Sequence, residues 1–177
     1  MAGKGSEYKK SESGGVTTFE VTPAAAPKFW YMLIIGIPCV LGGLLALPAG
    51  LIFIAMGGFA CWYGWTRDLR PKATRGPMTF KVTPDKIEAG GQTFKKDDIH
   101  RVILKNSITD KELPMEMYTS NTNVAAGMAF RAQASMIANT LNVEMGGKST
   151  PIAGGMDNTT AYGLLADVCK IMGYKIS

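Results

Sequence analysis

The chain has 177 residues, a net charge of +5 and 46% hydrophobic residues. This length allows one small domain beside a strongly apolar segment. The modest charge, with no basic stripe interleaved with exposed aromatic residues, argues against nucleic acid as a partner. One histidine and three dispersed cysteines do not make a four-ligand zinc site, so we expect neither a metal nor a cofactor.

Residues 1–28 are predicted to form a flexible arm with one short strand. Residues 1–16 are rich in Gly, Ser, Lys and Glu, and offer little apolar surface to offset the entropy of ordering. Residues 17–22 alternate apolar and polar side chains, which indicates a strand. Its sequence TFEVTP returns as TFKVTP at 79–84. Either this is accidental, or the strands occupy equivalent places in one sheet, with Glu20 opposite Lys81 as a favourable pair.

Residues 29–65 contain no Asp, Glu, Lys, Arg or His. One transmembrane helix needs about 20 apolar residues, so this run predicts two spans that reverse at residues 47–50, Leu-Pro-Ala-Gly. A signal peptide is shorter and starts earlier, and one helix of this length exceeds the thickness of the bilayer. The remaining alternative is a buried helix pair in a water-soluble protein. We therefore predict an α-helical transmembrane hairpin.

Small residues gather in both halves of the apolar run. They allow helices to approach closely, either within the hairpin or between copies of the chain. The residues are Gly36, Gly42, Gly43, Gly57, Gly58 and Ala60.

Aromatic and basic residues flank the run as expected at a membrane interface. Aromatic side chains favour the headgroup region, and Lys and Arg favour the cytoplasmic side. Residues 66–77 form a basic connector, and the loop between the predicted spans is uncharged, so both termini are expected in the cytoplasm. The predicted membrane-interface anchors are Trp30, Tyr31, Trp62, Trp65, Arg67, Arg70 and Lys72.

Residues 78–177 read as short strands, glycine turns and a final helix. The amphipathic segment Asp157–Tyr174 places its apolar residues on one helical face, with Asp157 or Asn158 as its cap. Residues 120–139 fit either a short helix or a mobile loop. The predicted strands are 78–83, 87–89, 92–94, 99–105, 115–119, 140–145 and 149–153, with hairpin turns at Gly90-Gly91 and Gly146-Gly147.

The sequence TFKVTPDKIEAGGQTFKKDDI at 79–99 resembles the opening of bacterial pleckstrin-homology-like domains. In those domains a strand, a glycine hairpin and a polar turn lead into the third strand, and a pair of membrane spans often precedes the domain. The resemblance implies that 78–177 is a cytoplasmic α+β domain of antiparallel strands closed by a C-terminal helix. It also implies a location in the bacterial inner membrane.

No catalytic motif is present, and the sole histidine, His100, has no evident catalytic partner, so we do not expect an enzyme. The predicted function is a membrane-anchored structural or assembly subunit that presents a small binding domain within a larger bacterial envelope complex. Its expected partners are the phospholipid bilayer and other proteins or copies of itself. The alternative is a lipid- or ligand-sensing module at the membrane surface.

Three large side chains stand out in an otherwise small-residue stretch. Aromatic residues and Arg are frequent anchors of protein interfaces. The candidate partner contacts are therefore Met128, Phe130 and Arg131.

Overall fold

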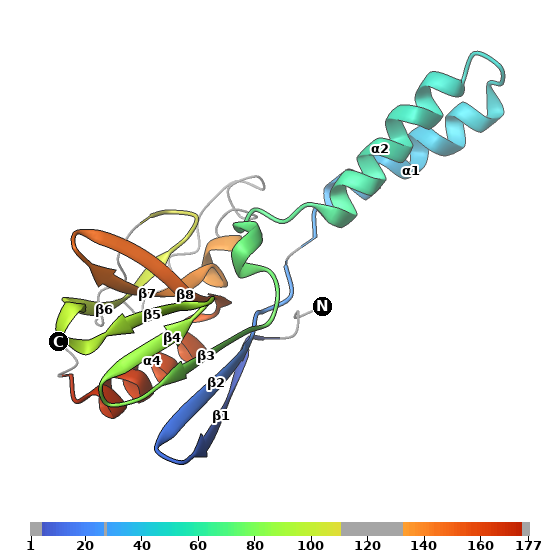
Figure 1. The fold of residues 1–177 in the computed structure, drawn as a ribbon. Coiled ribbons are helices and arrows are strands. Elements are labelled where there is room, and N and C mark those ends of the chain that lie inside the picture. Colours follow the sequence, from blue (N-terminus) through green and yellow to red (C-terminus); the bar gives the residue numbers. More distant parts are fainter. Residues whose placement is uncertain (1–4, 27, 111–132, 175–177) are drawn as a thin grey trace. The chain divides into compact units, whose positions relative to one another are not determined.

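The computed structural model describes residues 5–26, 28–110 and 133–174. The chain divides into two compact units. The first, here called the two-sheet unit, combines Met1–Ala25 with Arg70–Ser177. The second, here called the helix pair, is Ala26–Leu69. The helix pair is therefore an insertion between two parts of one folded unit, as the colours along the chain show (Figure 1).

The first sheet of the two-sheet unit contains five antiparallel strands in the order β1-β2-β3-β4-β5. Its strands are β1 (Glu7–Ser13), β2 (Val16–Thr22), β3 (Met78–Val82), β4 (Lys86–Ala89) and β5 (Gln92–Lys95). The hairpin between β4 and β5 turns at Gly90-Gly91, where both residues have positive φ. This confirms the turn that the sequence predicted, because glycine adopts such angles without a steric cost.

The second sheet contains three antiparallel strands in the order β6-β7-β8. They are β6 (Arg101–Asn106), β7 (Asn139–Met145) and β8 (Lys148–Met156). Helix α4 (Asn158–Met172) follows, and two short 3-10 helices, η1 (Lys72–Thr74) and η2 (Lys96–Asp98), lie in the connections. The predicted final helix is confirmed: Asp157 accepts from Thr160 N at its start, and Gly173 at its end is left-handed.

One hydrophobic core joins the two sheets and α4. Phe19 of β2 stacks on Phe80 of β3 with the ring centroids 5.2 Å apart, and both side chains are buried. Leu141 of β7 and Leu164 of α4 belong to the same cluster. Burial of such large apolar side chains is the main favourable term in the folding of this unit.

The N-terminal strands differ from the expectation of a flexible arm. Residues 7–13 form β1, which pairs along its length with β2. The two copies of the TF(E/K)VTP pattern do lie side by side, but Glu20 faces Thr79 and Lys81 faces Thr18. Because the strands are antiparallel, pairing about Phe19 and Phe80 exchanges the residues that flank each phenylalanine, so the expected Glu20–Lys81 pair is wrong.

The helix pair consists of two antiparallel helices, α1 (Trp30–Leu45) and α2 (Leu51–Thr66), joined by a turn at 46–50. Glycine at every seventh position forms the seam between them. A Cβ on Gly36 would lie 2.8 Å from the Gly57 carbonyl oxygen, and one on Gly57 would lie 2.6 Å from the Gly36 carbonyl oxygen. Gly42 and Gly58 have no such neighbour within 4 Å, so they do not form the seam. The other seam residues are Gly43, Gly50 and Gly64.

No helix in the described parts of the chain is long and apolar enough to cross a membrane. α1 and α2 have 16 residues each, which corresponds to about 24 Å against a hydrocarbon core of about 30 Å. The predicted fold class is therefore wrong in its transmembrane hairpin, and so is the predicted location in the inner membrane. The structure instead has an α+β unit of antiparallel sheets, interrupted by a short apolar helix pair.

The domain boundary that the resemblance implied is also wrong. A pleckstrin-homology-like domain that follows two spans was expected to begin at residue 78. The five-stranded sheet instead takes β1 and β2 from the chain before the helix pair. The repeated TFEVTP pattern was the sequence signal for this arrangement.

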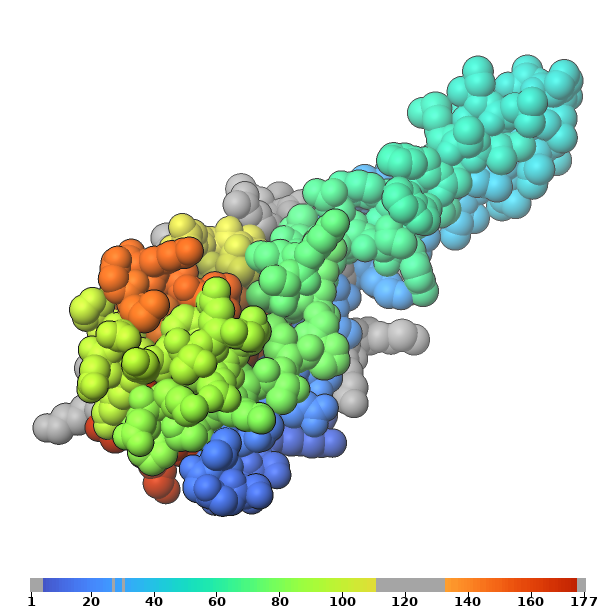
Figure 2. Space-filling view, viewed as in Figure 1, coloured from blue at the N-terminus to red at the C-terminus, as the bar shows by residue number. Residues whose placement is uncertain are grey.

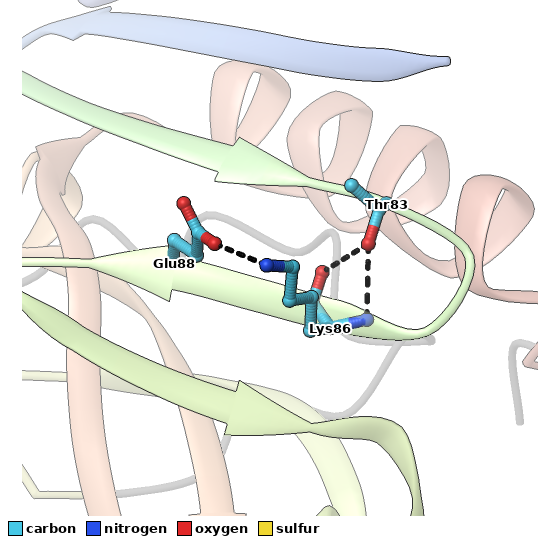
Figure 3. A network of polar contacts seen from close by, with 3 residues as sticks. All are labelled: Thr83, Lys86 and Glu88. Carbon is cyan, nitrogen blue, oxygen red and sulfur yellow. Dashed lines mark hydrogen bonds and ion pairs between the residues drawn. The ribbon is translucent and has the colours of Figure 1, made fainter.

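The turn between β3 and β4 is closed by a small polar network on the surface (Figure 3). Thr83 Oγ1 accepts from Lys86 N at 3.2 Å, and Lys86 Nζ pairs with Glu88 Oε1 at 2.6 Å. The Lys86 ammonium lowers the pKa of the Glu88 carboxyl, first through their hydrogen bond. Exposed ion pairs contribute little stability, so the network mainly fixes the geometry of the turn.

The start of the chain is tied to the start of α4. Asp157 Oδ2 accepts from Ser6 N at 3.1 Å and from Ser6 Oγ at 2.7 Å, while Thr160 Oγ1 donates to the Ser6 carbonyl at 2.9 Å. Burial alone raises the pKa of the Asp157 carboxyl, but hydrogen bonds from Thr160 and Ser6 outweigh it and lower the pKa. One carboxylate thus caps α4 and holds the segment that leads into β1.

Replacing Asp157 by Ala is expected to lower the free energy of unfolding by about 2 kcal/mol, since it removes a helix cap and two further hydrogen bonds. The folded-state pKa lies below the unfolded value of about 3.9, so the stabilisation is complete above about pH 4. It is lost as the pH falls through the folded-state pKa. Urea unfolding of the full chain followed by circular dichroism at several pH values measures this. The exposed Asp97→Ala variant is the control, and an equal loss there contradicts the prediction.

Replacing Gly57 by Leu is expected to separate α1 from α2, because the new side chain meets the Gly36 carbonyl and Cys39 Cβ. Overpacking of this kind costs about 1–3 kcal/mol. Alkylation rates of Cys39 and Cys61, followed by mass spectrometry, should rise. The matched control is Gly58→Leu, where nothing lies within 4 Å. Equal rates in the two variants show that the seam does not hold the helices together.

Candidate interaction surface

The helix pair exposes large apolar side chains along both helices. Ile34 of α1 is 73% exposed, Ile52 of α2 is 69% exposed, and Leu45 beside the turn is 91% exposed. Neither helix contains a charged residue. The space-filling view draws residues 31–66 of the pair in colours that run from cyan to green (Figure 2). Monomeric proteins in water rarely leave apolar patches of more than a few hundred Å² uncovered.

This apolar exposure is not confined to one narrow stripe. Ile34 and Ile35 are both exposed, as are Leu44 and Leu45, and so is the run 51–53 on α2. Neighbouring residues of a helix point about 100° apart, so the exposed side chains cover a wide arc of each helix. A helix that is apolar all round requires an apolar environment rather than a single flat partner surface.

The cationic side chains and the described Trp and Tyr rings of the pair lie at the end that is remote from the turn. Lys28 Nζ lies 3.0 Å from the centroid of the Trp65 ring, and the Arg67 guanidinium lies 5.0 Å from that of Tyr63. Cations over aromatic faces are attracted by the ring quadrupole. We call Lys28, Tyr31, Trp62, Tyr63, Trp65 and Arg67 the collar. At the opposite end, the turn carries no charge.

The predicted anchors divide between the two units. Tyr31, Trp62 and Trp65 are exposed on the helix pair, at 44%, 61% and 54%. Trp30 is the first residue of α1, and Arg67 is exposed at the end of α2. Lys72 is exposed in η1 of the two-sheet unit. The predicted partner contacts Met128, Phe130 and Arg131 lie outside the described residues.

Arg70 occupies a different place from the surface position expected of an interface anchor. Its side chain is 3% exposed, and Nη1 donates to the Ala24 carbonyl at 2.8 Å. Ala24 N in turn donates to the Gly155 carbonyl in β8 at 2.8 Å. Gly155 has a φ of 72°, and a Cβ there would meet Pro23 and the Thr74 carbonyl at 2.6 Å. Arg70 therefore joins the two chain segments that flank the helix pair to the second sheet.

Lys28 and Tyr63 were not among the predicted anchors. Lys28 directly precedes the apolar run, and Tyr63 lies between two tryptophans. Their positions beside the other aromatic residues were the available signal. Pairing across the two helices, which puts Lys28 over Trp65, depends on the register of the pair and could not be derived from spacing alone.

The two-sheet unit has a shallow groove of about 210 Å³. Lys105, Thr140 and Asn142 lie in its wall, with Asp110 among the remaining residues. Asn142 Nδ2 donates to Thr140 Oγ1, which donates to the Lys105 carbonyl, so these groups mainly satisfy one another. The groove contains no nucleophile paired with a general base, and thus no catalytic arrangement.

His100 and the possible metal-ligating side chains show no catalytic arrangement among the described residues either. His100 is exposed and its backbone N donates to the Glu144 carbonyl at 2.9 Å. Within the described residues, no group of three or more His, Cys, Asp or Glu side chains could hold a metal ion. Strands β2 and β3 are both internal to the five-stranded sheet, so neither offers an open edge to which a partner could add a strand. The predicted absence of catalysis stays a prediction.

Comparison of the chain with protein-family models, curated proteins and solved structures finds no match. The resemblance to bacterial pleckstrin-homology-like proteins therefore has no support from these comparisons.

Replacing Arg70 by Gln is expected to destabilise the two-sheet unit by about 1.5–3 kcal/mol, because a buried charged donor is lost from the Ala24 carbonyl. Lys72→Gln, on the exposed residue two positions later, should leave stability unchanged within about 0.5 kcal/mol. Urea unfolding of both variants measures the difference. If the two variants unfold alike, Arg70 does not tie these segments together.

Proposed function

We propose that the chain is a non-enzymatic structural or assembly subunit. It attaches through the helix pair to an apolar partner and presents the two-sheet unit as a binding domain. The observation that carries this proposal is the exposure of large apolar side chains along both α1 and α2, with no charged residue in either helix. Apolar burial of this extent supplies a strong drive to associate.

The division of the chain supports the same assignment. The two-sheet unit has its own core of both sheets and α4, and it does not need the apolar side chains of the helix pair to complete it. The glycine seam lets α1 and α2 pack closely, and their bulky side chains remain exposed on the outside of the pair. The pair is therefore built to hold together and to contact something else.

The expected size of the native assembly tests the proposal. The tagged full chain, extracted from its own source in a mild detergent, should appear by native mass spectrometry in a complex larger than the 19.0 kDa monomer. That complex should contain other proteins, further copies or bound phospholipid. A bare, lipid-free monomer contradicts the proposal.

A charge in the apolar surface should abolish this association. Ile52→Glu places a carboxylate where the wild-type side chain is 69% exposed, so the fold of the monomer should be unchanged while the complex is lost. The matched control is Thr93→Glu, on an exposed position of β5 in the two-sheet unit. Complexes of equal size from wild type and Ile52→Glu show that the helix pair is not the attachment surface.

A further inference from the structure

The apolar surface of the helix pair and its collar together identify one class of partner. We infer that the apolar partner is phospholipid, which the pair enters with its turn first, and that the collar binds anionic headgroups. The inference rests on the proposed function, and deepens it by naming the partner. It does not require either helix to cross the bilayer.

The distribution of charge along the pair is the first argument. Lys28 and Arg67 lie together at the end remote from the turn, while α1, α2 and the turn between them are uncharged. A protein partner would be expected to offer polar or charged contacts that fix its register. Between the collar and the turn, the helices offer no charged side chain for such contacts. A lipid phase needs none, because acyl chains have no directional groups to satisfy.

The wide arc of exposed side chains is the second argument. One partner helix or one sheet face covers only one side of a helix, whereas Ile34, Ile35 and Leu44 on α1 point in different directions and are all exposed. Acyl chains surround a helix and cover every such direction at once. The most exposed apolar side chain, Leu45, lies beside the turn, at the end that we propose enters first.

The collar supplies the third argument, because it combines the groups that a headgroup region favours. Trp and Tyr place an apolar ring in the chains and a polar group in the water-rich layer. Lys28 and Arg67 each sit over one of these rings, so the cations are held at the same level as the aromatic belt. Lys and Arg near a bilayer surface attract anionic lipids.

The helix lengths fix the depth that this geometry predicts. Sixteen residues correspond to about 24 Å, which exceeds half of a hydrocarbon core of about 30 Å and falls short of the whole. With the collar among the headgroups, the middle of the pair should lie near the bilayer midplane and the turn should lie beyond it, still within the acyl chains. A helix pair that lies flat on the surface would instead hold the turn and the collar at one depth.

Tryptophan fluorescence measures these depths directly. All three tryptophans of the chain, residues 30, 62 and 65, are at the collar end. The full chain is mixed with vesicles of phosphatidylcholine and phosphatidylglycerol that carry bromine either near the headgroup or near the chain end. Wild type should be quenched most by shallow bromine. A variant with the three tryptophans changed to Phe and Leu41→Trp, at an exposed position near the middle of α1, should be quenched most by deep bromine. Equal depths for the two reporters overturn the inference.

Vesicle flotation tests the choice of headgroup. Binding of the full chain should be tighter to vesicles that contain phosphatidylglycerol than to phosphatidylcholine alone. Removing both collar cations in Lys28→Gln/Arg67→Gln should weaken binding to the anionic vesicles by about fivefold for each cation. The matched control, Lys9→Gln/Lys148→Gln, removes two exposed cations of the two-sheet unit and should change binding less than twofold. Equal losses in both double variants overturn the role of the collar.

The outcomes separate this inference from the proposed function. A chain that forms a large protein complex in mild detergent but binds no vesicles disproves the lipid partner and leaves the assembly role intact. A chain that appears as a bare, lipid-free monomer and binds no vesicles disproves both.

Discussion

The pairing of β2 with β3 is the contact on which the rest of this architecture depends. It joins strands that lie on opposite sides of the helix pair in the sequence, with Phe19 stacked on Phe80 at the centre of the register. Without it, β1 and β2 would have no place in the five-stranded sheet. The entropic cost of closing a loop rises only slowly with its length, so an insertion as long as the helix pair is tolerated once this contact forms.

Local patterns in the sequence predicted the elements that short-range chemistry determines. The glycine turns at 90–91 and 146–147 and the helix that Asp157 caps all agree with the structure, because each depends on neighbours within a few residues. The strand β1 was missed, since EYKKSES contains one large apolar side chain and gains its order from β2 and from Asp157. The bonds that Asp157 accepts from Ser6, just before β1, span 151 positions, which composition cannot reveal.

The interpretation of the apolar run erred for a different reason. A hydropathy reading gives the number of residues between charges. Some of those residues form the turn and the helix ends, so each helix is shorter than the apolar run suggests. Residues 46–50 form the turn, and 16 residues remain in each helix. The register of the pair was not predicted either. Of the small residues expected to mediate close packing, Gly36, Gly43 and Gly57 lie in the seam, whereas Gly42 and Gly58 have open space around them.

Arg70 shows why a list of flanking cations is a poor guide to a surface. In sequence it is one of several basic residues after the apolar run, yet it is buried and donates to the Ala24 carbonyl. Ala24 N donates to the Gly155 carbonyl of β8 and Thr74 lies against both Gly154 and Gly155, so the chain leaves the two-sheet unit and returns to it at adjoining points of the second sheet. Buried polar groups must be paired, and here the Arg70 guanidinium and the Ala24 carbonyl satisfy each other. Residues 24 and 70 therefore belong to the buried part of the two-sheet unit, although both stand close to the helix pair in the sequence.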